Sequence, residues 1–251
     1  MSPKPARRTS HSSGRFRARM ARGDSDIAAA QRLRALAFRT GTQDRDGFDD
    51  RCLHLLVEDS GSGLLVCCAR VMMVNDDRDL ERCYSAQFYD LSALSGFDGP
   101  MAELGRFCIH PDWTDPDILR LAWGKLAGFV DDNNIGMLFG CSSFAGTETE
   151  TYLDTFAMLR ARHLAPRRWL PRKKAPDVFR YAKGRVRRPD MKRALRAMPP
   201  LLRSYLMMGG WVSDHAVVDR QMNTLHVFTG LEIDAIPLSR KRLLRAAGAG
   251  V

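Results

Sequence analysis

The order of strand-like and helix-like segments constrains this chain most. Apolar and polar residues alternate over 15–21, and helical spacing then runs from Asp24 or Ser25 to about Arg39. Pro116 stands at the first position of another expected helix, where proline is favoured. The β-α-β-β-β-α-β-α order predicts a mixed sheet with helices packed on it, in the α/β (α+β) class. The expected segments after the first helix are 52–58, 64–73, 101–109, 116–134, 135–144 and 146–163.

The remaining segments complete one domain with basic ends. The sequence predicts a short helical piece near 84–94 and closing strands at 211–219 and 225–233. We expect a flexible basic tail, one folded domain that includes a basic 160–210 region, and a second basic tail. Their bounds are 1–14, 15–240 and 241–251.

Positive charge gathers after residue 160. Between Arg160 and Arg196 there are fifteen lysines and arginines and two acids. Apolar residues recur at helical spacing over 190–206, opposite a basic face, and Pro199-Pro200 interrupts them. Two interpretations of this stripe stay open: packing against the sheet, or an interfacial helix on anionic lipid.

The total charge favours acidic partners without choosing among them. A formal charge of +10 suits nucleic acid, an anionic membrane, an acidic carrier protein or a phosphate-bearing cofactor. The four tryptophans are scattered and no reading motif is present, which argues against nucleic acid. No apolar run approaches the roughly 18 residues that span a bilayer, and no apolar segment follows the basic N-terminus as a secretory signal requires.

The six cysteines show no ligand spacing and sit mostly in apolar, strand-like runs. They predict buried free thiols in a reducing cytoplasm and no metal site. A nucleophilic role is open to Cys108 or the Ser142-Ser143 pair with a histidine such as His54, but packing roles are favoured for all of them.

The segment AELGRFCIHPDW carries the most chemistry. In a regular strand Glu103 and Arg106 point to opposite faces, but Gly105 between them predicts a bulge. A bulge places the carboxylate and the guanidinium on one side and opens the strand from its neighbour. Acyl transfer to an amine needs such an opening and a base near the amine. A surface ion pair is the alternative that spacing leaves open.

The pattern ELGRFCIHPDW (103–113), followed by FGCSSFAGTE (139–148), resembles the ornithine N-acyltransferases of ornithine-lipid synthesis. These are distant relatives of the acyl-homoserine-lactone synthases within the GNAT fold. Further similar blocks are LRALAFR (33–39), DRDGFDDRCLHLLVE (44–58) and MPPLLRSYLMMGGWVSDHAVVDRQMNT (198–224). The resemblance covers about 15–240 and implies a GNAT acyltransferase fold with a basic helical C-terminal extension.

The resemblance implies a set of site residues. Glu103 and Arg106 are the expected catalytic residues, with Glu103 accepting the proton of ornithine's ammonium. Asp46 and Asp49 suit a cationic substrate, although solvated turn carboxylates are equally compatible. The arginines hold the substrate carboxylate or lock the loop by pairing with these aspartates, and we favour locking for Arg34 and Arg70. The full substrate-binding set is Asp46, Asp49, Phe38, Arg34, Arg70 and Phe107.

The expected acyl donor follows from a difference between this sequence and ordinary GNAT enzymes. These carry a glycine-rich loop before the helix for the CoA pyrophosphate, whereas this chain reads DWTDPDILRLAW (112–123). We therefore expect no bound cofactor and an acyl donor on the phosphopantetheine arm of acyl carrier protein, an acidic partner for the basic surface. The implied product is lyso-ornithine lipid, made in the cytoplasm with peripheral contact to the inner membrane.

Other functions stay open at this point. One keeps an enzyme but changes the reaction, to glutamine acylation or to lactone-forming synthesis on S-adenosylmethionine. The C-terminal block and the chain length argue against the lactone synthases, which are shorter. The other is a basic nucleic-acid-binding protein, which lacks a supporting motif here.

Overall fold

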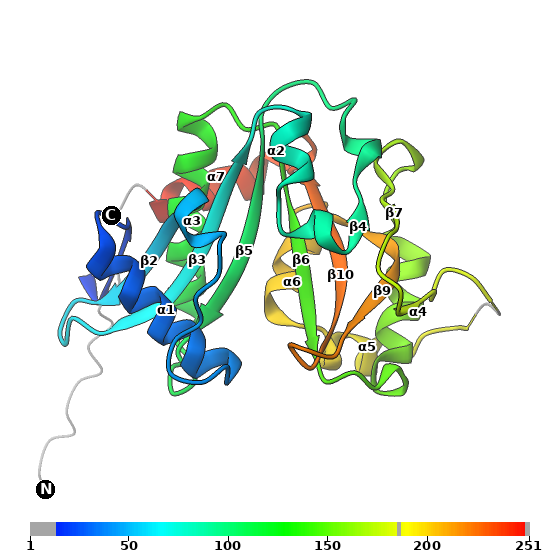
Figure 1. Cartoon of the computed structure of the whole chain (residues 1–251), viewed down its shortest axis with the longest axis horizontal. Helices are drawn as coiled ribbons and strands as arrows, with labels where there is room; N and C mark the ends of the chain where they lie inside the picture. The colour runs from blue at the N-terminus through cyan, green and yellow to red at the C-terminus, as the bar shows by residue number, and fades with distance from the viewer. Residues whose placement is uncertain (1–13, 185–186, 249–251) are drawn as a thin grey trace, which may run out of the picture.

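A single mixed sheet organises the protein, whose computed structural model describes residues 14–184 and 187–248 (Figure 1). Eight strands follow the order β1-β2-β3-β5-β6-β10-β9-β8, and a separate two-stranded sheet pairs β4 with β7. Neighbours are antiparallel except β5 and β6, which are parallel. The predicted mixed sheet is confirmed. The strands are β1 Phe16–Met20, β2 Leu53–Asp59, β3 Leu65–Val74, β4 Tyr89–Asp90, β5 Met101–Ile109, β6 Met137–Ala145, β7 Arg172–Lys173, β8 Val178–Phe179, β9 Trp211–Asp219 and β10 Thr224–Glu232.

Helices cover both faces of the large sheet (Figure 1). One face carries α1 and α2, and the other carries α3, α7 and, farther along, α4 to α6. The helices are α1 Asp24–Phe38, α2 Asp77–Glu81, α3 Pro116–Asp132, α4 Leu153–Arg162, α5 Met191–Ala197, α6 Pro200–Met207 and α7 Leu238–Gly248. Short 3₁₀ helices lie at Asp49–Arg51, Ser85–Gln87, Ser92–Leu94, Thr149–Tyr152, Arg167–Trp169 and Ile233–Ala235.

The start of α3 shows how the sequence sets a helix boundary. Asp115 is its N-cap, and the side chain accepts a hydrogen bond from the backbone N–H of Asp117 at 3.0 Å. Pro116 takes the first helical position, as predicted. Apolar residues including Leu121, Trp123 and Leu126 then pack against the sheet.

The predicted helical piece near 84–94 is present as two 3₁₀ helices, one on either side of β4. The sequence predicts a basic tail from residue 241, but the chain there continues α7 to Gly248. Leu244 packs on the core below α3, and Arg245 donates to Asp131 of α3 at 2.9 Å. Of the expected N-terminal tail, residues 1–13 lie outside the described part.

The apolar stripe of 190–206 is split between α5 and α6 at the two prolines. Ala194, Met198 and Leu202 are buried in a core with α4 and the strands β9 and β10. Tyr205 is buried against α3. Leu195 alone of the stripe's large apolar side chains is exposed. Core packing therefore accounts for the stripe. Among the described residues, no helix combines the length and apolarity that crossing a bilayer requires.

Candidate active site

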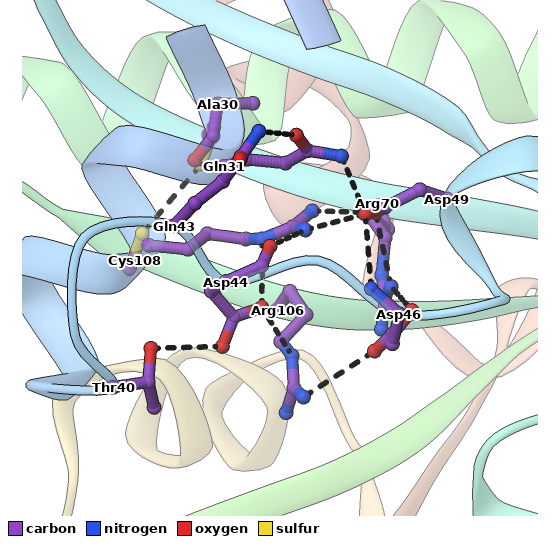
Figure 2. Close-up of polar contacts among 12 residues, drawn as sticks. Ala30, Gln31, Thr40, Gln43, Asp44, Asp46, Asp49, Arg70, Arg106 and Cys108 are labelled. Atoms are coloured by element: carbon purple, nitrogen blue, oxygen red, sulfur yellow. Dashed lines mark hydrogen bonds and ion pairs between the residues drawn. The ribbon is translucent and has the colours of Figure 1, made fainter. Parts of the chain in front are cut away.

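Arginines and aspartates meet in a network of ion pairs beside α1, part of which Figure 2 shows. This arginine–aspartate cluster consists of Arg34, Arg70, Arg106, Asp44, Asp46 and Asp49. The arginines come from α1, β3 and β5, and the aspartates come from the loop and 3₁₀ turn that follow α1. The cluster therefore ties this loop to the helix and to two neighbouring strands.

Arg34 and Asp49 form the buried end of the cluster. A guanidinium nitrogen of Arg34 lies 2.8 Å from an Asp49 carboxylate oxygen, and its Nε donates to Asp44 at 3.2 Å. Gln31, one helical turn earlier, donates to Asp49 at 2.9 Å. Burial opposes ionisation of Asp49, but the hydrogen bonds from Arg34 and Gln31 and the charges of Arg34 and Arg70 outweigh it and lower the pKa. Buried charges are thus matched inside the protein.

Arg70 and Arg106 form the open end. Arg70 donates to Asp46 and, at 3.1 Å, to Asp49, while Arg106 lies 3.4 Å from Asp46. The side chain of Asp46 is 26% exposed and that of Arg106 15%. Pairing of Arg34 and Arg70 with the aspartates is the contact that loop locking predicts. The alternative of solvated turn carboxylates is wrong, since Asp49 is buried and Asp46 is bonded to two arginines. A role in substrate binding stays a prediction.

β5 carries the predicted bulge. Its pairing with β3 shifts register here, and Arg106 has φ 49°. The left-handed conformation costs a non-glycine residue about 1–2 kcal/mol, and such residues gather at functional sites. The residue with positive φ in this bulge is Arg106, and the neighbouring Gly105 does not have positive φ. The bulge brings Glu103 and Arg106 to one face, where both contact Tyr84.

Glu103 is buried at 4% exposure beside this bulge. Its two carboxylate oxygens accept hydrogen bonds from the backbone N–H groups of Tyr84 and Ser85, each at 2.7 Å. Burial raises the pKa of Glu103 and outweighs these hydrogen bonds and the charge of Arg70. A carboxylate with a raised pKa accepts a proton more readily than an exposed one.

The sheet opens at Glu103. The parallel pairing of β5 with β6 joins Met101–Glu103 to Met137–Phe139 and stops there, although both strands continue. Where β5 and β6 begin to part, their backbones are very close: a Cβ on Gly140 would lie 2.2 Å from the carbonyl oxygen of Leu104. Glycine is required at that position. Beyond Gly140 the two strands no longer pair with each other. The predicted opening of β5 from its neighbour is confirmed.

Aromatic residues lie near β5 on both faces of the sheet. The guanidinium of Arg106 lies 5.8 Å from the ring centre of Phe38 and 5.4 Å from that of Tyr84. On the opposite face, the ring of Tyr205 meets that of Trp123 edge-on at 5.2 Å. The Tyr205 hydroxyl is buried without a hydrogen-bond partner among the described residues. Burial, and then the charge of Glu103, raise the pKa of Tyr205.

A groove of about 490 Å³ adjoins Tyr205 on that face, between α3, α6 and α7. Its lining is mostly apolar and includes Trp123 and the exposed side chains of Met207 and Leu243. Arg120 and Arg240 also line it. The charged cluster therefore lies on one face of the sheet, and the apolar groove lies among the helices of the other face.

Most predicted site residues come together, but Phe107 does not. It packs on the α3 face and stacks with Trp123 at 6.5 Å, away from the arginine–aspartate cluster. Sequence reasoning missed Asp44, one of several acids in DRDGFDD, and the loop at Tyr84 and Ser85. That loop acts through backbone N–H groups, which leave no side-chain signal.

Other candidate chemistry is not supported. His54 is buried with its Nε2 3.1 Å from the carbonyl oxygen of Asp49. The Cys108 sulfur lies 3.6 Å from that of Cys68, and the pKa of Cys108 is raised by this contact and by burial. These are packing roles. Within the described ranges, no three His, Cys, Asp or Glu side chains are grouped to hold a metal ion.

Comparison with known proteins places this geometry in a class. A family model described as an acetyltransferase (GNAT) domain matches residues 30–124. FeeM, an N-acyl amino acid synthase from uncultured soil microbes, has a solved structure that matches with a TM-score of 0.51. The match has 9% identity over 94% of this chain and 98% of FeeM, and so shows a shared fold. The sheet that parts beside a buried carboxylate is that of a GNAT acyltransferase.

Two curated relatives specify the family. The L-ornithine N(α)-acyltransferase of Rhodobacter capsulatus is 31% identical over 239 residues, which are 88% of this chain and 91% of the relative. The L-ornithine N(α)-acyltransferase of Brucella abortus is 31% identical over 247 residues, 89% of this chain and 86% of the relative. The chain belongs to the L-ornithine N(α)-acyltransferase family.

Proposed function

We propose that this protein transfers a fatty acyl group, such as a 3-hydroxyacyl group, from acyl carrier protein to the α-amine of L-ornithine. The product is lyso-ornithine lipid, the first intermediate of ornithine-lipid synthesis. The observation that carries the proposal is the buried Glu103 at the point where β5 and β6 part, in a chain of this family. The opening gives a thioester and an amine access to each other beside one base.

The reaction is aminolysis of a thioester. Glu103 accepts a proton from the ornithine α-ammonium, directly or through water, and frees the nitrogen lone pair. The nitrogen attacks the thioester carbonyl carbon, a C–N bond forms, and the C–S bond breaks. The nitrogen loses a second proton as it becomes an amide, the leaving thiolate takes up that proton to become the free thiol, and Glu103 returns its own proton to solvent. The raised pKa of Glu103 supports its use as the base, because it brings proton affinity closer to the working pH.

The open end of the arginine–aspartate cluster is the proposed ornithine site. Arg106 is the most exposed of the three arginines and lies beside Tyr84, which contacts the Glu103 carboxylate through its backbone. We assign the substrate carboxylate to Arg106 and the side-chain ammonium to Asp46. Arg34 and Asp49 are too deeply buried to reach a ligand. Their role is to hold the loop in position.

The start of α3 supports a donor without a pyrophosphate. The Asp115 carboxylate already binds the backbone N–H of Asp117, one of the groups that would receive a phosphate there. Two aspartates at this end also repel an anion. A phosphopantetheine arm on acyl carrier protein has no pyrophosphate, and the groove beside Tyr205 offers an apolar path for its acyl chain. We propose that no cofactor is bound.

We propose a cytoplasmic protein that touches the inner membrane peripherally. The single-chain product is amphipathic, and α5 presents Lys192, Arg193 and Arg196 as exposed side chains. Its apolar stripe is used in the core, so membrane attraction through this helix is electrostatic. The same basic region suits the acidic carrier protein.

The proposal is tested by product analysis. Purified protein is given a 3-hydroxyacyl carrier protein and L-ornithine, and amide products are identified by mass spectrometry with fragmentation that separates α- from side-chain amides. We expect the α-amide and one free thiol per turnover. L-glutamine in place of ornithine tests the acceptor, and acyl-CoA tests the donor. Faster turnover with acyl-CoA contradicts the carrier assignment, and preference for glutamine contradicts the acceptor assignment.

A further inference from the structure

A basic cavity of about 500 Å³ lies at the far edge of the large sheet, near β7 and β9. Five cationic side chains line it: Arg167, Arg172, Lys173, Arg180 and Lys183. They come from the chain after α4 and from the turn beyond β8, which the fold brings together. The acyl-transfer opening between β5 and β6 lies elsewhere in the sheet, three strands from β8 by way of β10 and β9.

Among the described residues, no carboxylate oxygen lies within 4 Å of a charged nitrogen of the five cations, although the charges of Lys183 and Arg172 act on Asp214 and Asp90 from farther away. Other arginines of the basic region do have ion-pair partners: Arg168 lies 3.0 Å from Glu232, and Arg220 lies 2.9 Å from Asp177. Like charges gathered around one concave surface repel one another, and the concavity strengthens the field inside it. An anion in the cavity would relieve this repulsion.

The single acid of the lining is already engaged. An Asp214 carboxylate oxygen lies 2.6 Å from Nδ1 of His215, and the hydrogen bond with this histidine lowers the pKa of Asp214. His215 also lines the cavity and is 2% exposed. Its Nε2 is buried and has no hydrogen-bond partner among the described residues. A buried ring nitrogen without a partner is a polar group that a ligand can satisfy.

We propose that the basic cavity binds a phosphate-bearing anion. Arginine guanidinium groups match phosphate oxygens bidentately, and lysines add point charge. The volume lies in the range of small-molecule sites, about 300–1,000 Å³, so an organic phosphate fits as well as the free ion. A protein helix would need a broad surface, whereas these cations converge on a cavity with a buried histidine. This binding does not rest on the proposed acyl transfer.

The test measures binding of three probes by calorimetry at fixed ionic strength. Inorganic phosphate represents the free ion, and glycerol 1-phosphate and phosphatidylglycerol vesicles represent a lipid headgroup. The variant Arg180→Gln/Lys183→Gln removes two cations from the cavity, at exposed positions where folding should be kept. The matched control Lys192→Gln/Arg196→Gln removes one arginine and one lysine from exposed positions on α5, outside the cavity.

We expect the cavity variant to weaken binding of at least one probe by about tenfold or more, since charged hydrogen bonds are lost. For inorganic phosphate and glycerol 1-phosphate, the control should stay within about twofold of the wild type, because the α5 cations lie outside the cavity and salt screens their attraction. Vesicle binding is left out of this comparison, because α5 is itself proposed to meet anionic lipid. Circular dichroism checks that both variants are folded. Tightest binding of inorganic phosphate identifies the free ion, and tighter binding of the glycerol probes identifies a headgroup.

The proposal is overturned if none of the three probes binds the wild type, or if the soluble probes lose binding equally in the two variants. If no phosphate probe binds the wild type and the cavity variant loses acyl carrier protein binding, the cavity is a protein-docking surface. None of these results contradicts acylation of ornithine by the wild type, so the two proposals fail separately.

Discussion

Replacement of Arg34 by methionine should be among the most damaging changes to the arginine–aspartate cluster. The Arg34 side chain is 1% exposed and pairs with both Asp44 and Asp49. Removing one partner of a buried ion pair typically costs 3–5 kcal/mol. Asp49 keeps Arg70 at 3.1 Å, so we expect a loss near the lower end, about 3 kcal/mol of the free energy of unfolding. Methionine keeps much of the side-chain volume and limits any cavity.

Arg19→Met is the matched control. Arg19 also bridges two carboxylates, Asp26 and Glu58, at 2.6 and 2.5 Å, but its side chain is 19% exposed. These pairs are partly exposed, and solvent screens them more than the buried Arg34 pairs; fully exposed pairs contribute about 1 kcal/mol or less. Urea unfolding followed by circular dichroism gives the midpoint and slope for each variant. If Arg34→Met loses no more stability than Arg19→Met, burial does not decide the strength of the cluster and the reasoning is refuted.

Three further predictions concern the substrate, the donor side and the basic surface. Asp46→Asn should raise KM for ornithine about tenfold, equal to ~1.4 kcal/mol, but not KM for 2-aminopentanoate, which lacks the side-chain amine; equal changes for both would contradict the ammonium assignment. Tyr205→Phe, on the face that carries the groove proposed for the acyl chain, should not lower the melting temperature, because the buried hydroxyl has no hydrogen-bond partner among the described residues; a clear fall in the melting temperature would contradict this reasoning. Changing Lys192, Arg193 and Arg196 to Glu should release the folded protein from anionic vesicles, since each cation contributes about 1 kcal/mol there. Unchanged vesicle binding with lost carrier affinity assigns this surface to the carrier protein.

The strands and helices of the first half of the chain could be predicted from the sequence, because their local residue patterns match the positions that they take in the folded protein. The segment 101–109 is apolar and bounded by polar turns, and β5 has these bounds. Pro116 likewise marks the start of α3. The helix α7 was missed because its arginines resemble a solvated tail. It is held by Leu244 in the core and by Arg245 on Asp131, a contact across 114 residues that no local pattern reveals.

The candidate site was predictable where charge and strand position coincide. Glu103 and Arg106 stand on one strand beside a glycine, so the bulge and the shared face could be inferred. The position of the residue with positive φ could not be inferred, because a glycine usually takes this conformation. Here Arg106 takes it, with its guanidinium paired to aspartates and placed beside aromatic rings. Phe107 was misplaced because the bulge, once present, sends its side chain to the α3 face.

The pH dependence of Glu103→Gln tests the central claim most directly, namely that Glu103 is the base for acylation of ornithine. In the wild type, kcat/KM should rise as Glu103 loses its proton, at a pH above the ordinary carboxyl range of about 4.3, because burial raises its pKa. Glutamine should remove this limb and lower the rate about 10²-fold or more at neutral pH. The loss should shrink at high pH, where the amine of ornithine deprotonates unaided, whereas a folding defect would persist. Near-full activity of Glu103→Gln at neutral pH would contradict the account and place the base elsewhere.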